Sequence, residues 1–133
     1  MKLKFYGTRG STPVCESSFT KFGGNTTCLF ISGLDDGAGT IIMDAGTGIR
    51  NLGKDIISGK IDVGEKINLG FTHYHWDHIQ GFPFFAPAYN RNSEIEIATA
   101  GNRKIQNVKD IFTIQMESTY FPVQLENLGA TAF

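Results

Sequence analysis

The histidines of this chain are gathered in one short segment. The sequence has three histidines in 133 residues, and all three lie in the run Thr72-His73-Tyr74-His75-Trp76-Asp77-His78. This run follows directly after the apolar, strand-like segment 67–71. Imidazole nitrogens together with the Asp77 carboxylate suit zinc and its first-row neighbours. A solvated loop that is rich in histidine is the alternative, but this density of ligands indicates a metal site.

The composition is that of one ordinary globular domain. The chain is 41% hydrophobic and 19% charged, and its net charge of −1 gives no long-range attraction to nucleic acid or to an anionic membrane. The sequence has neither a signal peptide nor a segment that could span a bilayer. We therefore expect a cytoplasmic protein with no membrane partner, in which Cys15 and Cys28 are reduced thiols.

Strands and helices alternate along the chain. Apolar and polar patterning predicts strands at 2–6, 28–32, 40–43, 66–71 and 94–98, the second and third forming a hairpin closed by segment 33–39. Helical spacing predicts one helix at 49–57, ended by Gly59, and another at 102–112 with Ile105, Val108 and Ile111 facing inward. This alternation favours a layered α/β domain.

A long glycine-rich connection, 7–25, follows the first strand. Backbone amides, Arg9 and the hydroxyls of Thr8 or Ser11 could lie near a phosphate there, or the segment could be a plain turn that ends at Pro13. Asn25 and Thr26 leave a similar choice between polar substrate contacts and turn-forming hydrogen bonds to the backbone. A loop of this length inside a compact domain is more often functional than idle.

A cluster of aromatic residues follows the histidine segment in the sequence. They could line a pocket beside the metals, but burial in the core is the favoured interpretation for the cluster Phe82, Phe84, Phe85 and Tyr89. Trp76 stands between two candidate ligands, and we expect it to pack beneath the loop and fix its shape.

Several of these motifs resemble one known superfamily. Segment 72–78 has the T-H-x-H-x-D-H form of the metallo-β-lactamase fold superfamily, and segment 42–48 resembles the first motif of that superfamily. Segments 7–13, 23–27 and 79–85 are similar to its ribonuclease Z and cyclic-phosphodiesterase branch. The resemblance covers essentially the whole chain. It implies an αββα sandwich, of which residues 1–133 form a single domain corresponding to the N-terminal half, a mixed sheet with flanking helices.

The resemblance also implies a dinuclear site. Two divalent ions, zinc or alternatively manganese or iron, would share an activated water. His73 and His75 would hold one ion, and Asp77 and His78 the other, with Asp77 also a candidate proton acceptor for the water. Asp44 would orient a ligand histidine or the backbone of this loop, unless it is a turn former at the end of a strand.

The implied function is a metal-dependent hydrolase, a phosphodiesterase on a small-molecule or nucleotide phosphodiester or on an RNA end. The superfamily takes its remaining ligands from the second half of its fold, so we expect this chain to be truncated on its C-terminal side, with an incomplete site. A non-catalytic metal-binding or oligomerising half-domain is the alternative. A thiolester or lactam hydrolase of the same fold is a second alternative. Half a sandwich leaves a sheet face uncovered, so a homo-oligomer is expected.

Overall fold

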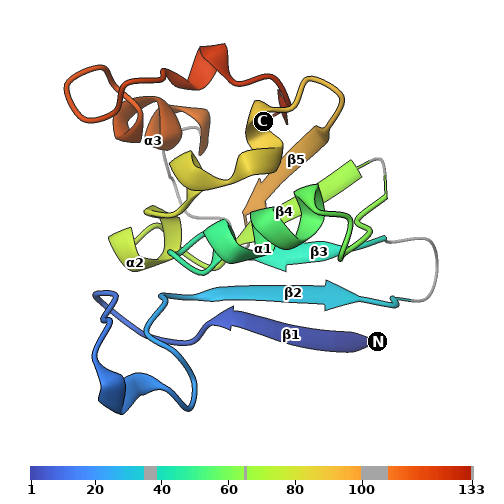
Figure 1. Ribbon diagram of the computed structural model, residues 1–133. Helices are drawn as coiled ribbons and strands as arrows, with labels where there is room; N and C mark the ends of the chain where they lie inside the picture. Colours follow the sequence, from blue (N-terminus) through green and yellow to red (C-terminus); the bar gives the residue numbers. More distant parts are fainter. Residues whose placement is uncertain (35–38, 65, 100–107, 133) are drawn as a thin grey trace.

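A mixed sheet runs through the protein, with its strands side by side in chain order (Figure 1). The computed structural model describes residues 1–34, 39–64, 66–99 and 108–132. The six strands of the sheet are β1 (Lys2–Gly7), β2 (Cys28–Ser32), β3 (Ile41–Met43), β4 (Lys66–Phe71), β5 (Glu94–Thr99) and β6 (Thr131–Ala132). The helices are α1 (Ile49–Ile57), α2 (Trp76–Ile79) and α3 (Val108–Gln115), with short 3₁₀ turns η1 (Ser17–Phe19), η2 (Phe82–Phe84), η3 (Ala86–Tyr89) and η4 (Leu125–Asn127). The predicted α/β class is confirmed.

The strand pairing changes from antiparallel to parallel at β3. β1 pairs with β2 and β2 with β3 in antiparallel register, with Phe30 opposite Ile42, so the predicted hairpin is confirmed. β3, β4, β5 and β6 then pair in parallel. Parallel neighbours need a crossover connection, and α1 supplies it between β3 and β4. The carboxyl ends of β3 and β4 therefore lie together at one edge of the sheet.

In the described part of the chain, α1, α2 and α3 all contribute to a core on one face of the sheet. Period-2 alternation turns Ile67, Leu69 and Phe71 of β4 toward this face, and each is almost completely buried. The Phe112 ring of α3 lies 5.1 Å from that of Phe71, which places α3 on the same face as the core. The largest fully buried side chains include Ile42, Ile49, Leu52, Leu69, Phe71, Phe82, Phe85, Ile95 and Phe112.

A polar contact ties strand β1 to helix α1. The Tyr6 hydroxyl donates to Asp55 at 2.7 Å, and the Lys4 and Lys60 ammonium groups lie 3.1 and 3.3 Å from the same carboxylate. The hydrogen bond from Tyr6, followed by that from Lys4, lowers the pKa of Asp55 from 3.8 to about 2. Because the folded-state pKa is depressed, this contact stabilises the protein above pH 4 and is lost as the pH falls toward 2. Tyr6 and Lys4 thus face α1.

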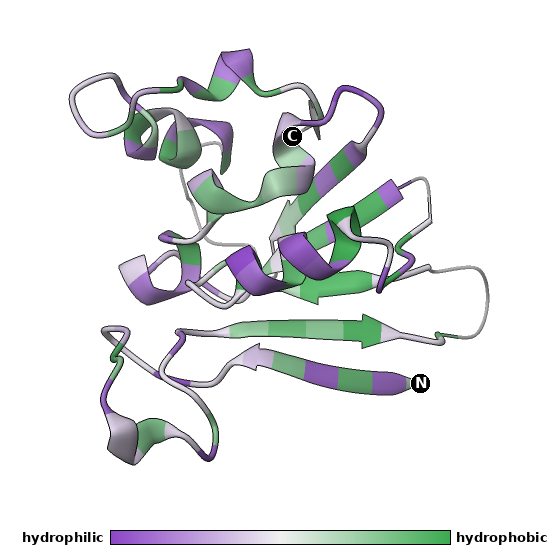
Figure 2. Cartoon of the chain, in the orientation of Figure 1, coloured by the Kyte–Doolittle hydropathy of each residue, from purple (hydrophilic) through white to green (hydrophobic). Residues whose placement is uncertain are grey.

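The opposite face of the sheet carries apolar side chains that the described helices do not cover. Since Lys4 and Tyr6 face α1, alternation turns Leu3 and Phe5 to the other side, where they are 52% and 62% exposed. Ile41 and Met43 line a hollow of about 440 Å³ on this same face. Figure 2 shows the alternation along β1 as bands of hydrophobic and hydrophilic colour. We call this surface the open face.

Three expectations are corrected by the structure. The last helix extends to Gln115 rather than ending at Phe112, and residues 102–107 of the predicted range, including Ile105, lie outside the described residues. Val108 and Ile111 pack against the core, as predicted, but Phe112 is the side chain that is fully buried. The aromatic cluster is divided, since Phe82 and Phe85 are buried whereas Phe84 and Tyr89 are exposed. Trp76 is 68% exposed, so it does not pack beneath the histidine loop.

None of the helices in the described part of the chain has the length and apolar character needed to cross a membrane. Cys15 is exposed and Cys28 is buried, and both are free thiols, as predicted.

Candidate metal-binding site

The candidate ligands lie at the carboxyl end of β4. That strand ends at Phe71, residues 72–75 form a short connection with a bend at Thr72, and α2 begins at Trp76. His75 is still extended, with φ −63° and ψ 152°, so the chain turns into the helix only after the second histidine. The alternating pair His73 and His75 therefore precedes the turn, whereas Asp77 and His78 lie within the helix. The four predicted ligands come from one loop and one short helix.

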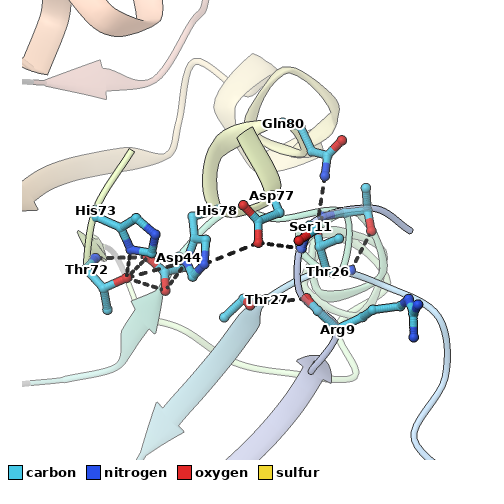
Figure 3. A network of polar contacts seen from close by, with 11 residues as sticks. Arg9, Ser11, Thr26, Thr27, Asp44, Thr72, His73, Asp77, His78 and Gln80 are labelled. Carbon is cyan, nitrogen blue, oxygen red and sulfur yellow. Dashed lines mark hydrogen bonds and ion pairs between the residues drawn. The ribbon is translucent and has the colours of Figure 1, made fainter. Parts of the chain in front are cut away.

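Asp44 holds this loop in place from the end of the neighbouring strand. Its carboxylate accepts hydrogen bonds from the Thr72 backbone amide at 2.9 Å and from the Thr72 hydroxyl. The same carboxylate lies 2.9 Å from His78 Nδ1 (Figure 3). The Asp44 side chain is only 3% exposed, so these contacts are shielded from water. Asp44 thus contacts both a candidate ligand histidine and the loop backbone, and it also turns the chain, with φ +63°.

The contact with Asp44 decides which nitrogen of His78 is available. When Nδ1–H donates to a carboxylate, Nε2 is the nitrogen with a free lone pair. His78 Nε2 lies 3.5 Å from Asp77 Oδ2, which is longer than a good hydrogen bond. Two ligands on one tetrahedral zinc, each about 2.0–2.1 Å from the ion, lie roughly 3.3 Å apart. The His78–Asp77 pair therefore has the separation of two ligands on a single divalent ion.

The three imidazole rings are neighbours. The His73 ring centroid lies 4.5 Å from that of His75 and 4.0 Å from that of His78. Partial burial, together with the nearby His78 and His75 rings, lowers the pKa of His73, which favours the neutral form that metals bind. Within the described residues, no set of three or more His, Cys, Asp or Glu side chains is already placed around one point. The donor types suit a divalent ion. In position, the agreement is with one pair of ligands, His78 Nε2 and Asp77 Oδ2, rather than with a complete set.

A backbone amide from the glycine-rich loop reaches the Asp77 carboxylate. Ser11 N–H donates to Asp77 Oδ2 at 2.8 Å, and Ser11 is in the left-handed region with φ +66°. This hydrogen bond is the main reason that the pKa of Asp77 is lowered. A lowered pKa keeps the carboxylate ionised, which suits a metal ligand better than a general base.

The other predicted residues of the glycine-rich loop differ in where they lie. Thr8 lines a hollow of about 470 Å³ whose wall also includes Asp44 and Thr72. Arg9 is directed away from the histidines, as Figure 3 shows, because its Nε donates to the Thr12 carbonyl and its guanidinium lies 4.3 Å from the Phe19 ring. Of the predicted contacts in this loop, Ser11 reaches a candidate ligand, and Thr8 shares a hollow with Asp44 and Thr72.

Thr26 is fully buried and lies among loops rather than at a surface. Its hydroxyl accepts from the Thr47 amide at 2.8 Å and from the Gln80 side chain at 3.2 Å, while its own amide donates to the Thr47 hydroxyl. The Asn25 carbonyl accepts from two amides of the glycine-rich loop, and its side chain contacts the Thr47 hydroxyl. These contacts join neighbouring loops: Thr26 bonds through its hydroxyl to a backbone amide, whereas the Asn25 side chain bonds to the Thr47 hydroxyl.

Several residues that shape the site were not singled out from the sequence. They are Thr72, Thr47, Gln80 and Gln115, the last of which donates from Nε2 to the Ile79 carbonyl at 2.9 Å. Thr72, Thr47 and Gln80 lie within segments 72–78, 42–48 and 79–85, so the sequence motifs could have indicated a role for them. Gln115 is more than thirty residues away, in the third helix, and the sequence gives no signal for it.

Comparisons with known proteins found no relative: no protein-family model matches the chain, and neither does any curated protein or solved structure. The function is therefore inferred from the site itself.

Proposed function

We propose that this chain carries the main ligand loop of a metal-dependent hydrolase that acts on phosphodiesters. The observation that carries the proposal is the pair formed by His78 and Asp77. The Nδ1–H of His78 donates to the Asp44 carboxylate, which leaves the Nε2 lone pair available. Nε2 lies 3.5 Å from Asp77 Oδ2, which is the spacing of two ligands on one ion. The adjacent rings of His73 and His75 supply two further nitrogens.

The proposed fold is a metallo-β-lactamase-like αββα sandwich, of which this chain forms the N-terminal half. Two features support it: the helices of the described residues pack on one face of a mixed sheet, and the histidine loop follows a central parallel strand. A second sheet would cover the open face. In the proposed protein the remaining metal ligands come from that second layer, so the four residues of this chain make up part of the set.

We assign the ligand roles as the resemblance implies. His73 and His75, which precede the turn, would hold one ion, and Asp77 and His78 the other. Divalent ions, with zinc proposed ahead of manganese and iron, would supply an activated water and neutralise charge on the phosphate. Asp44 orients His78, and the Ser11 amide keeps the Asp77 carboxylate ionised and fixed in direction. Asp77 would also be the candidate proton acceptor for the water, but its lowered pKa favours metal ligation over proton acceptance.

Hydrogen-bond donors beside Asp77 support a phosphate-containing substrate. The glycine-rich loop lies against Asp77 through Ser11, and its residues Thr8, Ser11 and Thr12 are exposed. Hydroxyls and turn amides of this kind bind phosphate oxygens. A small-molecule or nucleotide phosphodiester fits this loop, and an RNA end carries the same group.

The open face supports a second candidate, a half-domain whose role is to associate. Leu3 and Phe5 are more than half exposed on a sheet face that the described helices leave uncovered. Apolar surface of this kind drives self-association or docking of another sheet.

Zinc content separates the two candidates. His73→Ala and His75→Ala should each lose most of the zinc that the parent chain retains, because a partial site cannot spare a ligand. Asp77→Asn should lower zinc content and abolish any hydrolysis of a chromogenic phosphodiester seen with added zinc. Asp110→Asn, an exposed carboxylate on α3, is the matched control and should behave like the parent. Equal zinc by elemental analysis in the parent and both histidine variants would refute the proposed site.

A further inference from the structure

A second hollow lies at the opposite end of β4 from the histidines. Its volume is about 500 Å³, and it is bounded by the end of α1, the turn after α1, the start of β4 and the turn before β5. Ile67, near the start of β4, lines it, whereas the histidine segment follows the end of that strand (Figure 1). At about 3.3 Å per residue, Ile67 and Phe71 alone are about 13 Å apart. The hollow is therefore separate from the candidate metal site.

The wall of this hollow combines aliphatic and polar groups. Its aliphatic part comes from α1, the turn after it and β4, and consists of Val63 and four isoleucines. Of these, Ile67 is 2% exposed and belongs to the core, whereas Ile57 is 57% exposed at the rim. The polar residues of the wall are Asp62, Asn90, Asn92 and Ser93. A volume of this size with a few polar groups in an apolar lining is typical of sites for small molecules.

Both turns that frame the hollow are held by their own hydrogen bonds. In the turn after α1, Gly64 N–H donates to Asp62 Oδ1 at 2.8 Å. In the turn before β5, Asn92 N–H donates to the Asn90 side chain and Ser93 N–H to the Asn90 carbonyl, both at 3.0 Å. A ligand that enters the hollow therefore does not have to order these turns, which lowers the entropic cost of binding.

The charge in the lining is negative. Asp62 is the one charged residue among the described residues that line the hollow. Its carboxylate accepts from the Gly64 amide, and within the described residues it forms no ion pair with a lysine or arginine. A carboxylate with two oxygens has further lone pairs available for a donor. The hollow therefore suits a cationic group better than an anionic one.

The cations close to this hollow in the sequence are directed elsewhere. Lys60 lies 3.3 Å from Asp55, and Lys66 pairs with Glu96 on the next strand. The stem of Arg91 lies against the segment that precedes β6. These contacts leave the negative charge at the hollow without a positive neighbour from the turns that form it.

We propose that this hollow binds a small aliphatic amine in its ammonium form. The isoleucines and Val63 contact the hydrocarbon part, and the ammonium group, which has three donors, bonds to the Asp62 carboxylate and to the side-chain oxygens of the turn before β5. A ligand with a carboxylate or phosphate in place of the amine would bring a second negative charge beside Asp62. The proposal does not depend on the metal site.

Two probes of equal carbon number and opposite charge test the proposal. The intact chain, labelled with ¹⁵N, is titrated with n-hexylamine and, separately, with hexanoate. A chelator is present so that coordination of the amine to a metal ion does not contribute. The amide signals of Gly59, Gly64 and Ser93, which line the hollow, should shift saturably with hexylamine. Hexanoate should bind at least about fivefold more weakly, because its charge is repelled by Asp62.

Substitutions at Asp62 separate charge recognition from simple filling of an apolar hollow. Asp62→Lys should reverse the preference, so that hexanoate binds more tightly than hexylamine. Asp62→Asn should weaken hexylamine by about two- to fivefold, the range expected for an ion pair open to solvent. The asparagine oxygen can still accept from the Gly64 amide, so this variant decides the matter if Asp62→Lys does not fold. Asp110→Lys, an exposed position on α3, is the control and should keep the preference of the parent.

Several results would overturn the proposal. They are equal binding of the two probes to the parent, no saturable binding of either probe, and shifts confined to amides outside the hollow. An unchanged preference in a folded Asp62→Lys protein, or unchanged hexylamine affinity in Asp62→Asn, also overturns it. Zinc content should be the same in the parent and in all three variants, so failure of this proposal and failure of the metal site are measured separately.

Discussion

At the scale of single residues, Asp44 joins the candidate ligand His78 to the start of the histidine loop. One carboxylate contacts the backbone and hydroxyl of Thr72 and the Nδ1 of His78, and it is almost fully buried. A buried carboxylate of this kind requires hydrogen-bond donors, and here the donors are the groups that set the direction of the histidine loop. The left-handed backbone of Asp44 places the carboxylate directly at the end of β3.

Replacing this carboxylate by an amide tests its orienting role. In Asp44→Asn the side-chain oxygen can still accept from Thr72, but the amide NH₂ cannot accept from His78 Nδ1. We expect zinc affinity to fall by about 10- to 100-fold, as found for the partners of metal-bound histidines in general. Competition with a zinc chelator measures the change, and Asp110→Asn serves as the control. Unchanged zinc affinity in a folded Asp44→Asn protein would mean that His78 does not depend on this contact.

At the scale of elements, two loops and helix α2 meet at Gly46 with almost no free space. The Gly46 amide donates to the Thr27 carbonyl, and a Cβ added at Gly46 would lie 2.3 Å from the Asp77 carbonyl and 2.5 Å from the Thr26 hydroxyl. The loop after β3, the loop before β2 and helix α2 therefore approach one another at backbone distance. This contact requires glycine at position 46.

A single methyl group should consequently disturb the site through packing alone. In Gly46→Ala the new Cβ forces the Asp77 backbone or the Thr26 backbone to move, which we expect to cost about 1–3 kcal/mol of stability and to weaken zinc binding. Gly10→Ala is the matched control in the glycine-rich loop, because a Cβ there has open space around it. Thermal unfolding and zinc competition are compared for the two variants. Equal melting temperatures for Gly46→Ala and Gly10→Ala would show that the segments around Gly46 can move apart without loss of stability.

The elements that the sequence predicts well are those with a repeating signal. Alternation located β1, β2, β4 and β5, and helical spacing located α1 from Ile49 to Ile57. The histidine loop was found because its residue types are rare and adjacent. The contact of the Ser11 amide with Asp77 has no such signal, since a backbone donor leaves no trace in residue types. Exposure of Trp76 could not be predicted either, because burial of a side chain in a four-residue helix depends on neighbours distant in sequence.

At the scale of the whole molecule, the two faces of the sheet are unequal. One is covered by helices and contains the core, with Leu69 and Phe71 fully buried. The other exposes Leu3 and Phe5 beside a hollow lined by Ile41 and Met43. Apolar surface that is continuous over neighbouring strands is a site of association. The same feature supports both a second sheet in the proposed sandwich and contact between copies of this chain.

We expect the purified chain to self-associate through the open face, and Phe5 is the residue with which to test this. Removing a fully buried Phe or Leu contact costs about 1.5–3 kcal/mol, so Phe5→Lys should weaken association by tenfold or more. Ile57→Lys is the control, because Ile57 is similarly exposed, at 57%, but lies on α1 away from the open face. Light scattering over a range of concentrations should show multimers for the parent and Ile57→Lys, and a shift toward monomer for Phe5→Lys. A parent chain that remains monomeric at every concentration would contradict association through this face, as would an unchanged multimer in Phe5→Lys.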